Sequence, residues 1–342
     1  MERKLASIQK VAELSPITGA DKIEKCKILG WDCVVKKGEF QVGDMCVYIE
    51  IDSLIPKTIW SGFLFKEGTT VERYRLKTCK LRGQISQGLV LPIQVLYNAE
   101  HSKIDVLGEG DDVSELLGII KYEPDISPSL QGLMKGAFPC WIPKTDETRI
   151  QSEPWLLERK KDASIYITEK LDGSSMTCYL NEDVFGVCSR NMDMTETANS
   201  AYWYAARRQQ IEQSMRGEER QGWAIQGELI GPGIQKNKYE LKEPEFRAFN
   251  IYNIREGRYL DLMEFLNTCE RIGIPTVPLL GLESVRGNVD FWVEKSKGKS
   301  ELNPNADREG LVVRGVTEEA IEKYGRFSFK VINPEFLLKN GE

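Results

Sequence analysis

The chain has 342 residues, of which 41% are hydrophobic and 29% are charged, which fits about two globular domains and excludes fibrous or wholly disordered classes. Its net charge of −6 means that a nucleic-acid partner has to be held by local basic patches, not by the overall charge. No apolar run approaches the roughly 18 residues of a membrane-spanning helix. Residues 1–5 also lack the apolar core of a signal peptide, so we expect an intracellular protein with no membrane partner.

The residue counts also restrict the chemistry. Eight cysteines occur without a C-x-x-C pair, so we expect reduced and mostly buried thiols in place of a zinc ribbon or a disulfide framework. The only histidine, His101, lies in a polar stretch, which excludes two-histidine metal motifs and favours a solvated loop position over a catalytic one. Catalysis therefore has to depend on lysine, arginine, carboxylates or a bound metal.

Residues 5 to 95 show short strand patterns separated by turn residues. The expected strands are 5–12, 23–29, 31–36, 44–51, 73–79 and 88–93. About six short strands in a segment of this length predict a small closed barrel, OB-like or, nearly as well, SH3-like.

Three cations alternate with uncharged residues in the fifth of these strands. Arg73, Arg75 and Lys77 share one strand face by the period of two. This face is either a solvated edge protected by charge or a stripe that follows nucleic-acid phosphates, and the sequence favours neither.

The rest of the chain contains a proline-rich connector and a second domain, so the fold class is α+β. Residues 96–150 look like the connector, and strand patterning returns at 164–169. We predict an RNA-binding OB-like domain over 1–120, a linker over 121–145 and a second domain over 146–342. The expected helices are 198–215, 261–271 with Asp261 as N-cap, and 317–323.

The strand pattern 164–169 leads into a turn that carries the strongest chemical signal. Lys170 is followed by Leu171, Asp172 and Gly173, a Lys-x-Asp-Gly pattern that alone is weak because its residues are common. Four further residues follow at or near strand patterns: Glu228, Phe249, Glu309 and Lys330. Each taken singly has a structural explanation, but chance rarely builds the ordered set Lys, Glu, Phe, Glu, Lys.

This set resembles the covalent nucleotidyltransferase superfamily of polynucleotide ligases and RNA capping enzymes, over residues 149 to 330. The segments 81–88 and 144–151 are similar to ATP-dependent RNA ligases with an N-terminal OB domain. The resemblance implies an OB-like β-barrel followed by a nucleotidyltransferase (adenylyltransferase) domain of antiparallel sheets with flanking helices. It implies an RNA repair enzyme that uses ATP to join RNA 3′-OH and 5′-phosphate ends, and we expect a monomer.

The resemblance also implies how ATP is used. Lys170 attacks the α-phosphorus and carries AMP as a lysyl-AMP intermediate, Lys330 contacts the α-phosphate, and Arg149 orients the outer phosphates. Glu169 reads the adenine and Phe249 stacks on it. AMP then passes to the RNA 5′-phosphate, and a 3′-OH displaces it to seal the strand.

The remaining charged motif residues have implied roles in binding nucleotide, metal or RNA. Arg190, Glu228 and Arg314 are expected to contact ATP. Arg190 is also expected to contact RNA, as are Arg73, Arg75 and Lys77. Asp172, Glu228 and Glu309 are expected to gather Mg²⁺ or Mn²⁺, two ions in the adenylylation step, since carboxylate oxygens suit these cations.

A lysine amine is a nucleophile only when neutral, and its ordinary pKa is about 10.4. We expect a divalent cation beside Lys170, together with Lys330, to stabilise the free amine. One departure from the family concerns the last motif, which often has two lysines one residue apart. Ser328 and Ile332 flank Lys330 instead, and whether Arg326 supplies the second cation stays open.

Two other functions stay open. A capping guanylyltransferase uses the same lysine chemistry with GTP, but it and most DNA ligases place an OB domain after the last motif. Only 331–342 follow Lys330, which favours a ligase. The other alternative is a noncatalytic RNA-binding protein with a decayed ligase domain. The charged motif positions argue against it, because all of them are intact except for the second lysine.

Overall fold

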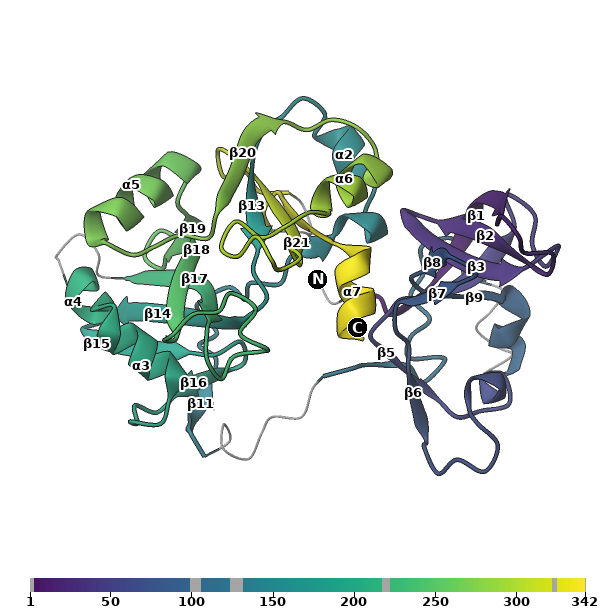
Figure 1. The fold of residues 1–342 in the computed structure, drawn as a ribbon, viewed down its shortest axis with the longest axis horizontal. Coiled ribbons are helices and arrows are strands. Elements are labelled where there is room, and N and C mark those ends of the chain that lie inside the picture. The colour runs from purple at the N-terminus through teal and green to yellow at the C-terminus, as the bar shows by residue number, and fades with distance from the viewer. Residues whose placement is uncertain (1–2, 99–105, 124–131, 217–221, 322–324, 342) are drawn as a thin grey trace. The chain divides into compact units, whose positions relative to one another are not determined.

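The computed structural model describes residues 3–98, 106–123, 132–216, 222–321 and 325–341 (Figure 1). They fall into two compact units. The first comprises Met1–Pro124 with Ile150–Leu156 and Pro334–Glu342, and the second comprises Asp125–Arg149 with Leu157–Asn333. His101 lies outside the described residues, and no described helix is long and apolar enough to cross a bilayer.

The first unit contains a five-stranded antiparallel sheet in the order β3-β2-β1-β4-β9, a three-stranded sheet β10-β5-β6 and a two-stranded sheet β7-β8. The elements of this unit are β1 (Ala6–Pro16), β2 (Ile23–Ile28), β3 (Trp31–Lys36), β4 (Met45–Ile49), β5 (Ser53–Pro56), η1 (Gly62–Leu64), β6 (Arg73–Arg75), β7 (Cys79–Leu81), β8 (Gln84–Ser86), β9 (Leu89–Pro92), η2 (Ile93–Asn98), β10 (Ile120–Lys121), η4 (Ile150–Ser152) and α7 (Pro334–Asn340). Gln87 N donates to Asp32 O (2.8 Å), which joins β3 to the segment before β9. The sheet therefore curls into a barrel, as predicted.

Both faces of β4 in this sheet are buried. In β4, Cys46 and Tyr48 pack in one hydrophobic cluster and Val47 and Ile49 in another, as the alternation of a strand requires. Val113, Leu117 and Ile119 belong to the second cluster. Part of the stretch that we expected to be a connector is therefore core.

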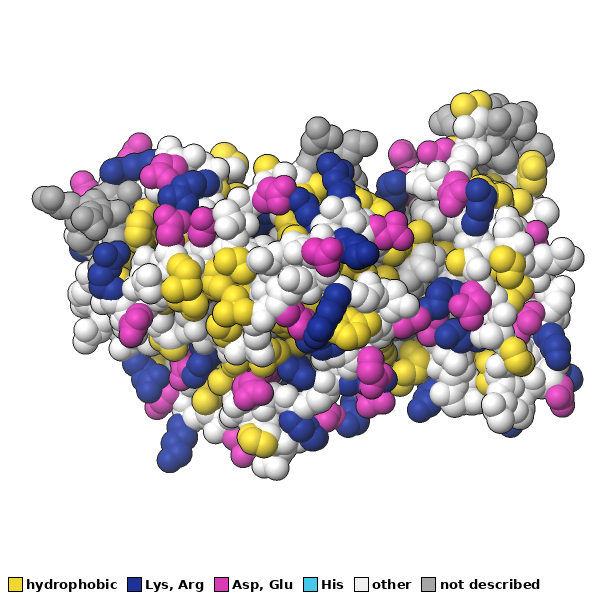
Figure 2. Space-filling view, turned by 90° about the horizontal axis from the view of Figure 1, so that it is seen from above, with side chains coloured by type: hydrophobic (Ala, Val, Ile, Leu, Met, Phe, Trp, Pro, Cys, Tyr) yellow, Lys and Arg dark blue, Asp and Glu magenta, His cyan; other side chains and the backbone are white. Residues whose placement is uncertain are grey.

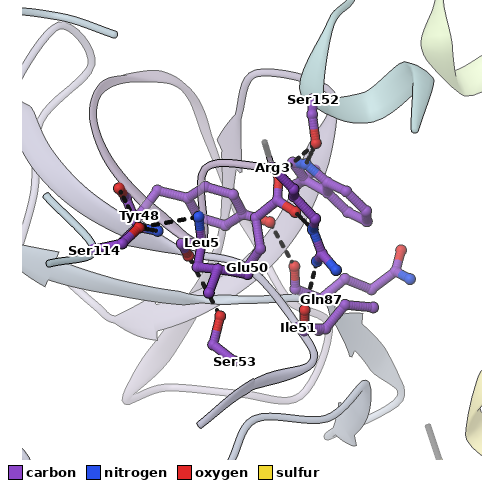
Figure 3. Close-up of polar contacts among 11 residues, drawn as sticks. Arg3, Leu5, Tyr48, Glu50, Ile51, Ser53, Gln87, Ser114 and Ser152 are labelled. Atoms are coloured by element: carbon purple, nitrogen blue, oxygen red, sulfur yellow. Dashed lines mark hydrogen bonds and ion pairs between the residues drawn. The ribbon is translucent and has the colours of Figure 1, made fainter. Parts of the chain in front are cut away.

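A buried carboxylate after β4 fixes a later segment to the first unit. Glu50 is 6% exposed and accepts from Arg3 Nε at Oε2 and from Ser152 Oγ at Oε1, each at 2.5 Å (Figure 3). Trp31 Nε1 also donates to Ser152 Oγ (3.3 Å). These bonds explain why residues 150–156 group with the barrel.

The second unit contains a seven-stranded sheet, β11-β16-β15-β14-β17-β18-β19, and a five-stranded sheet, β12-β22-β21-β13-β20. The strands are β11 (Met134–Ala137), β12 (Thr148–Arg149), β13 (Ser164–Lys170), β14 (Ser174–Asn181), β15 (Val184–Cys188), β16 (Met192–Met194), β17 (Trp223–Ile230), β18 (Glu245–Asn253), β19 (Arg258–Tyr259), β20 (Leu279–Ser284), β21 (Gly310–Gly315) and β22 (Ser328–Ile332). The helices are α2 (Trp155–Arg159), α3 (Ala201–Arg208), α4 (Ile211–Met215), α5 (Leu262–Ile272) and α6 (Val289–Ser296). The α+β fold class is as predicted, and α3, α4 and α5 share one hydrophobic core with the larger sheet (Figure 1).

The helix expected over 198–215 is two helices. Gln209 ends α3, and its side-chain amide pairs with the backbone of Phe246 on β18 through two bonds (2.9 and 2.7 Å). Gln210 then takes a left-handed conformation with φ of 52°. The prediction was wrong because a contact with a distant strand, not a local helix breaker, interrupts the helix.

Two other expected elements differ. Residues 317–321 are not helical, since Glu318 N donates to Asp261 Oδ1 (2.6 Å) and Phe327 N to Glu319 O (3.0 Å); 322–324 lie outside the described residues. The strand expected over 73–79 is two short strands, β6 and β7. The helix α5 is confirmed, with Asp261 as N-cap in a capping box.

The thiols agree with the sequence. All eight cysteines are free, and only Cys79 and Cys140 are exposed. The cysteines therefore form no disulfide bond in this structure.

Candidate active site

Lys170 is the last residue of β13, and the turn that follows leads from the five-stranded sheet into β14 of the seven-stranded sheet. The neighbouring strand β21 places Gly310 opposite Lys170. Glu309, the residue before Gly310, accepts from Lys170 Nζ at 2.6 Å. The two motif residues, distant in sequence, therefore meet where the two sheets join.

Gly173 allows this turn to lie against β17. A Cβ at this position would come within 2.4 Å of Leu229 O and 2.8 Å of Glu228 Cγ. The close approach therefore demands glycine, which gives a physical reason for the Gly of the Lys-x-Asp-Gly pattern. It also brings the turn beside Glu228.

Burial and neighbouring carboxylates act on Lys170 in opposite directions. Burial disfavours its charged form, but Glu309 and Glu228 more than offset burial, so the pKa of Lys170 lies above its ordinary value. Without a bound divalent cation, carboxylates are the charges that act most strongly on this amine. In this state Lys170 is an ammonium group.

Glu228 has a strongly raised pKa in this group of carboxylates. Burial, with the charges of Glu309 and Asp172, raises its pKa to about 8, although Lys170 opposes the shift. A group with such a pKa among two further carboxylates marks a place where additional positive charge is stabilising.

The third carboxylate, Asp172, has its own cation. Its Oδ2 lies 2.5 Å from Lys238 Nζ, and its backbone N–H donates to the hydroxyl of Tyr239 (2.7 Å). The described residues contain no group of three or more Asp, Glu, His or Cys side chains already arranged to hold a metal. Mg²⁺ and Mn²⁺ are commonly held by one or two carboxylates plus water and phosphate oxygens, which these side chains fit.

Glu169 and Phe249, the predicted adenine contacts, lie on β13 and β18. Glu169 is 1% exposed, accepts from Glu301 N (2.8 Å) at Oε2, and its Oε1 is buried without a described hydrogen-bond partner. Burial raises the pKa of Glu169. Such an oxygen fits a donor from a ligand, for example an exocyclic amino group. Phe249 is half-buried and packs near Leu171 and Tyr239.

Arg314 lies behind Phe249. Its guanidinium carbon is 5.3 Å from the ring centroid, and its Nη2 donates to Glu147 Oε1 (2.7 Å). The Arg314 side chain is only 2% exposed. Burial disfavours the charge, but Glu147 outweighs it and raises the pKa of Arg314. This arginine therefore supports the ring and is enclosed by protein.

The other predicted cations are spread over the unit. Arg149 on β12 lies in register with Lys330 on β22, and both are half-buried. Arg190 is exposed and pairs with Asp146 (2.6 Å). Arg326 is engaged elsewhere by an ion pair with Glu318 and by the ring of Tyr259, 4.1 Å away.

Sequence reasoning missed Lys238, Tyr239 and Glu147, which contact predicted site residues. The two lysines of 236–238, just after the glycines that follow Glu228, were an available signal. Nothing local marked Glu147.

The predicted cationic face of the first unit is divided. Arg75 pairs with Asp52 (2.8 Å) and lies 3.7 Å from the centre of the Tyr122 ring, and Arg73 donates to Gly118 O (2.9 Å). Lys77 lies beyond the end of β6 and is exposed. Figure 2 shows basic and acidic side chains interspersed on the face in view, in keeping with the net charge.

Comparisons with known proteins agree with this architecture. Residues 5–93 match an OB-fold domain model, and residues 163–332 match the RNA ligase model. A Naegleria gruberi RNA ligase mutant in its apo form is 39% identical, with a TM-score of 0.88 over 99% of this chain and 98% of that chain. The same ligase with PPi is 40% identical, with a TM-score of 0.87 over 99% of each chain. A mutant of it with ATP and Mn is 39% identical, with a TM-score of 0.88 over 98% and 99%. The comparison with curated proteins found no match.

An OB-fold followed by a lysine-centred two-sheet domain defines a covalent nucleotidyltransferase of the ligase type. The chain belongs to the RNA ligase family. The predicted family, fold and enzyme class are thereby confirmed.

Proposed function

We propose that this chain is an ATP-dependent RNA ligase that forms lysyl-AMP at Lys170 and joins RNA 3′-OH and 5′-phosphate ends, as in RNA repair. The observation that carries the proposal is the contact of Lys170 with Glu309, beside Glu228 and Asp172, at the junction of the two sheets. Naegleria gruberi RNA ligase was solved with ATP and Mn, with AMP and Mn, and with PPi, which are the substrate, the transferred group and the product of the first step.

In the first step Lys170 Nζ loses its proton to solvent water and bonds to the α-phosphorus, while the bond from that phosphorus to pyrophosphate breaks and pyrophosphate leaves. A divalent cation held by Asp172, Glu228 and Glu309 with phosphate oxygens would lower the pKa of Lys170 and offset phosphate charge. Arg149 and Lys330 supply fixed positive charge for the phosphates.

The adenine and the RNA are held by other parts of the chain. Glu169 accepts from the base and Phe249 stacks on it, while Arg314 acts behind that ring. AMP then passes from Lys170 to the RNA 5′-phosphate, and attack by a 3′-OH releases AMP. We assign RNA binding to a domain over 1–120 and to Arg190, with a linker over 121–145 and a ligase domain over 146–342 acting as a monomer.

Covalent labelling tests the proposal. The protein is incubated with labelled ATP or labelled GTP, and the adduct is located by mass spectrometry. We expect an acid-labile AMP adduct on Lys170, its loss in Lys170→Ala and its retention in Lys236→Ala, which removes an exposed lysine. Label from GTP alone would favour the guanylyltransferase alternative, and no label from either nucleotide would favour a noncatalytic protein.

The same variant tests the division into steps. Lys170→Ala should retain part of the sealing of a pre-adenylated RNA, because the lysine acts only before that intermediate. Equal loss in both assays would contradict this mechanism.

A further inference from the structure

Lys238 is a charged residue of the site that the ordered motif set does not include. Its ammonium nitrogen lies 2.5 Å from Asp172 Oδ2, and the two side chains are only 16% and 13% exposed. Ion pairs that are shielded from water are costly to separate, because each charge is then left unpaired. Asp172 therefore already has a cation when no ligand is present.

The loop that carries Lys238 is bound to the nucleophile's turn. Gln235 Nε2 donates to Gly173 O (3.2 Å), and the Tyr239 hydroxyl accepts from Asp172 N (2.7 Å). Asn303 Nδ2 holds the backbone oxygen of Lys238 (2.8 Å). These contacts deliver Lys238 to Asp172 from a fixed backbone position.

This loop is also conformationally strained. Gln235, Asn237 and Glu240 have positive φ angles of 47°, 45° and 54°, which residues other than glycine rarely adopt. The Asn237 side chain stabilises the conformation by bonding to both the N–H and the oxygen of Leu241 (3.2 and 2.9 Å). Strained backbone persists where surrounding contacts hold it in place, commonly at functional sites.

We propose that Lys238 is a resident counter-ion that occupies the cation position at Asp172 and is displaced when a divalent cation binds there. This inference rests on the proposed function, in which Asp172 helps to hold the metal. An ammonium group in contact with Asp172 repels a divalent cation approaching the same oxygens. Lys238 therefore weakens metal binding in the absence of nucleotide, and phosphate oxygens provide its alternative partner when ATP brings the metal.

The test is Mn²⁺ binding to the nucleotide-free, full-length protein, measured from the electron paramagnetic resonance signal of free Mn²⁺. Lys238→Met should lower the Kd about fivefold, the factor that corresponds to an ion pair of about 1 kcal/mol. Lys238→Arg, which keeps the charge, should bind as weakly as the natural chain. Lys236→Met removes a charge from the same loop at an exposed position and should leave the Kd unchanged.

Equal or weaker Mn²⁺ binding by Lys238→Met would overturn the inference, as would equal tightening by Lys236→Met, which would indicate only long-range charge. Thermal unfolding confirms that each variant is folded, and Lys238→Gln gives the same comparison if the methionine variant is not. Asp172→Asn separates the two hypotheses. If it binds Mn²⁺ like the natural chain, the proposed metal role of Asp172 fails; if it binds more weakly while Lys238→Met is unchanged, only the counter-ion role fails.

Discussion

The two units of the chain use charge differently. In the first unit partly buried charges pair with one another, such as Arg3 with Glu50 and Arg75 with Asp52. Each pair joins two segments of the barrel and is neutral in itself. Such pairs hold two backbone segments together, and because their charges balance they do not require a charged ligand.

In the second unit the charges around the turn are out of balance. Asp172, Glu228 and Glu309 lie together there; Lys170 contacts Glu309, and Lys238 contacts Asp172. Burial, together with repulsion by Glu309 and Asp172, raises the pKa of Glu228 to about 8. A neutral pair therefore indicates structure, whereas an excess of one sign in a shielded site indicates that a ligand completes it.

The largest effect is expected from a substitution in the carboxylate cluster around Lys170. Glu309→Gln removes the charge that Lys170 contacts and one expected metal oxygen, so lysine adenylylation should fall about 100-fold. The rate of AMP adduct formation at saturating Mg²⁺ measures it, with Glu182→Gln at an exposed turn as control. Adenylylation near the natural rate would show that this cluster is not the nucleotide site.

The next effect concerns a neutral pair in the second unit, Arg314 with Glu147, whose side chains are only 2% and 12% exposed. Glu147→Gln leaves the Arg314 guanidinium without its carboxylate, so the free energy of unfolding should fall by about 3 kcal/mol in urea denaturation. Asp52→Asn, in a pair whose side chains are 23% (Arg75) and 20% (Asp52) exposed, should cost about 1 kcal/mol or less. Similar costs for both would mean that shielding does not distinguish the pairs.

The Glu147 pair also has a pH dependence with a definite sign. Burial raises the pKa of Glu147, but Arg314 and Arg326 outweigh burial and hold it below the ordinary value. A lowered folded-state pKa contributes stability above the unfolded pKa, which is lost as the pH falls through the folded value. The stability gap between the natural chain and Glu147→Gln should therefore narrow in acid.

Glu228 should show the opposite sign. Its folded pKa of about 8 lies above the unfolded value, so the favourable contribution is present at low pH and is lost as the pH rises through 8. Glu228→Gln should melt about 3 °C above the natural chain at pH 9, with a smaller gap at pH 5. A constant difference across this range would remove the evidence for crowded carboxylates.

The smallest effect sharpens the role of the first unit. Replacing Arg73 and Lys77, the exposed cations, by alanine should weaken RNA sealing. The slope of log RNA affinity against log salt concentration should become shallower by about 2. Self-adenylylation should not change. Arg75→Ala should instead lower the melting temperature, because Arg75 is paired with Asp52. If adenylylation fell as much as sealing, these cations would be supporting the nucleotide site.

The sequence alone determined the features that depend on local pattern or motif order. The helix after Asp261 follows from its capping residue and periodicity, and the turn at 170–173 was recognisable from its residues and from the motifs that follow. These features depend on neighbours along the chain or on the order of strands, both of which are visible in one dimension.

Only the tertiary structure decided which distant side chains meet. The break after Gln209, the pairing of Glu147 with Arg314 and that of Lys238 with Asp172 join segments that share no local pattern. The raised pKa of Glu228 likewise arises from burial and from carboxylates that are distant in sequence. Burial and Coulomb interactions depend on distance in space, so they exist only once the two sheets have assembled.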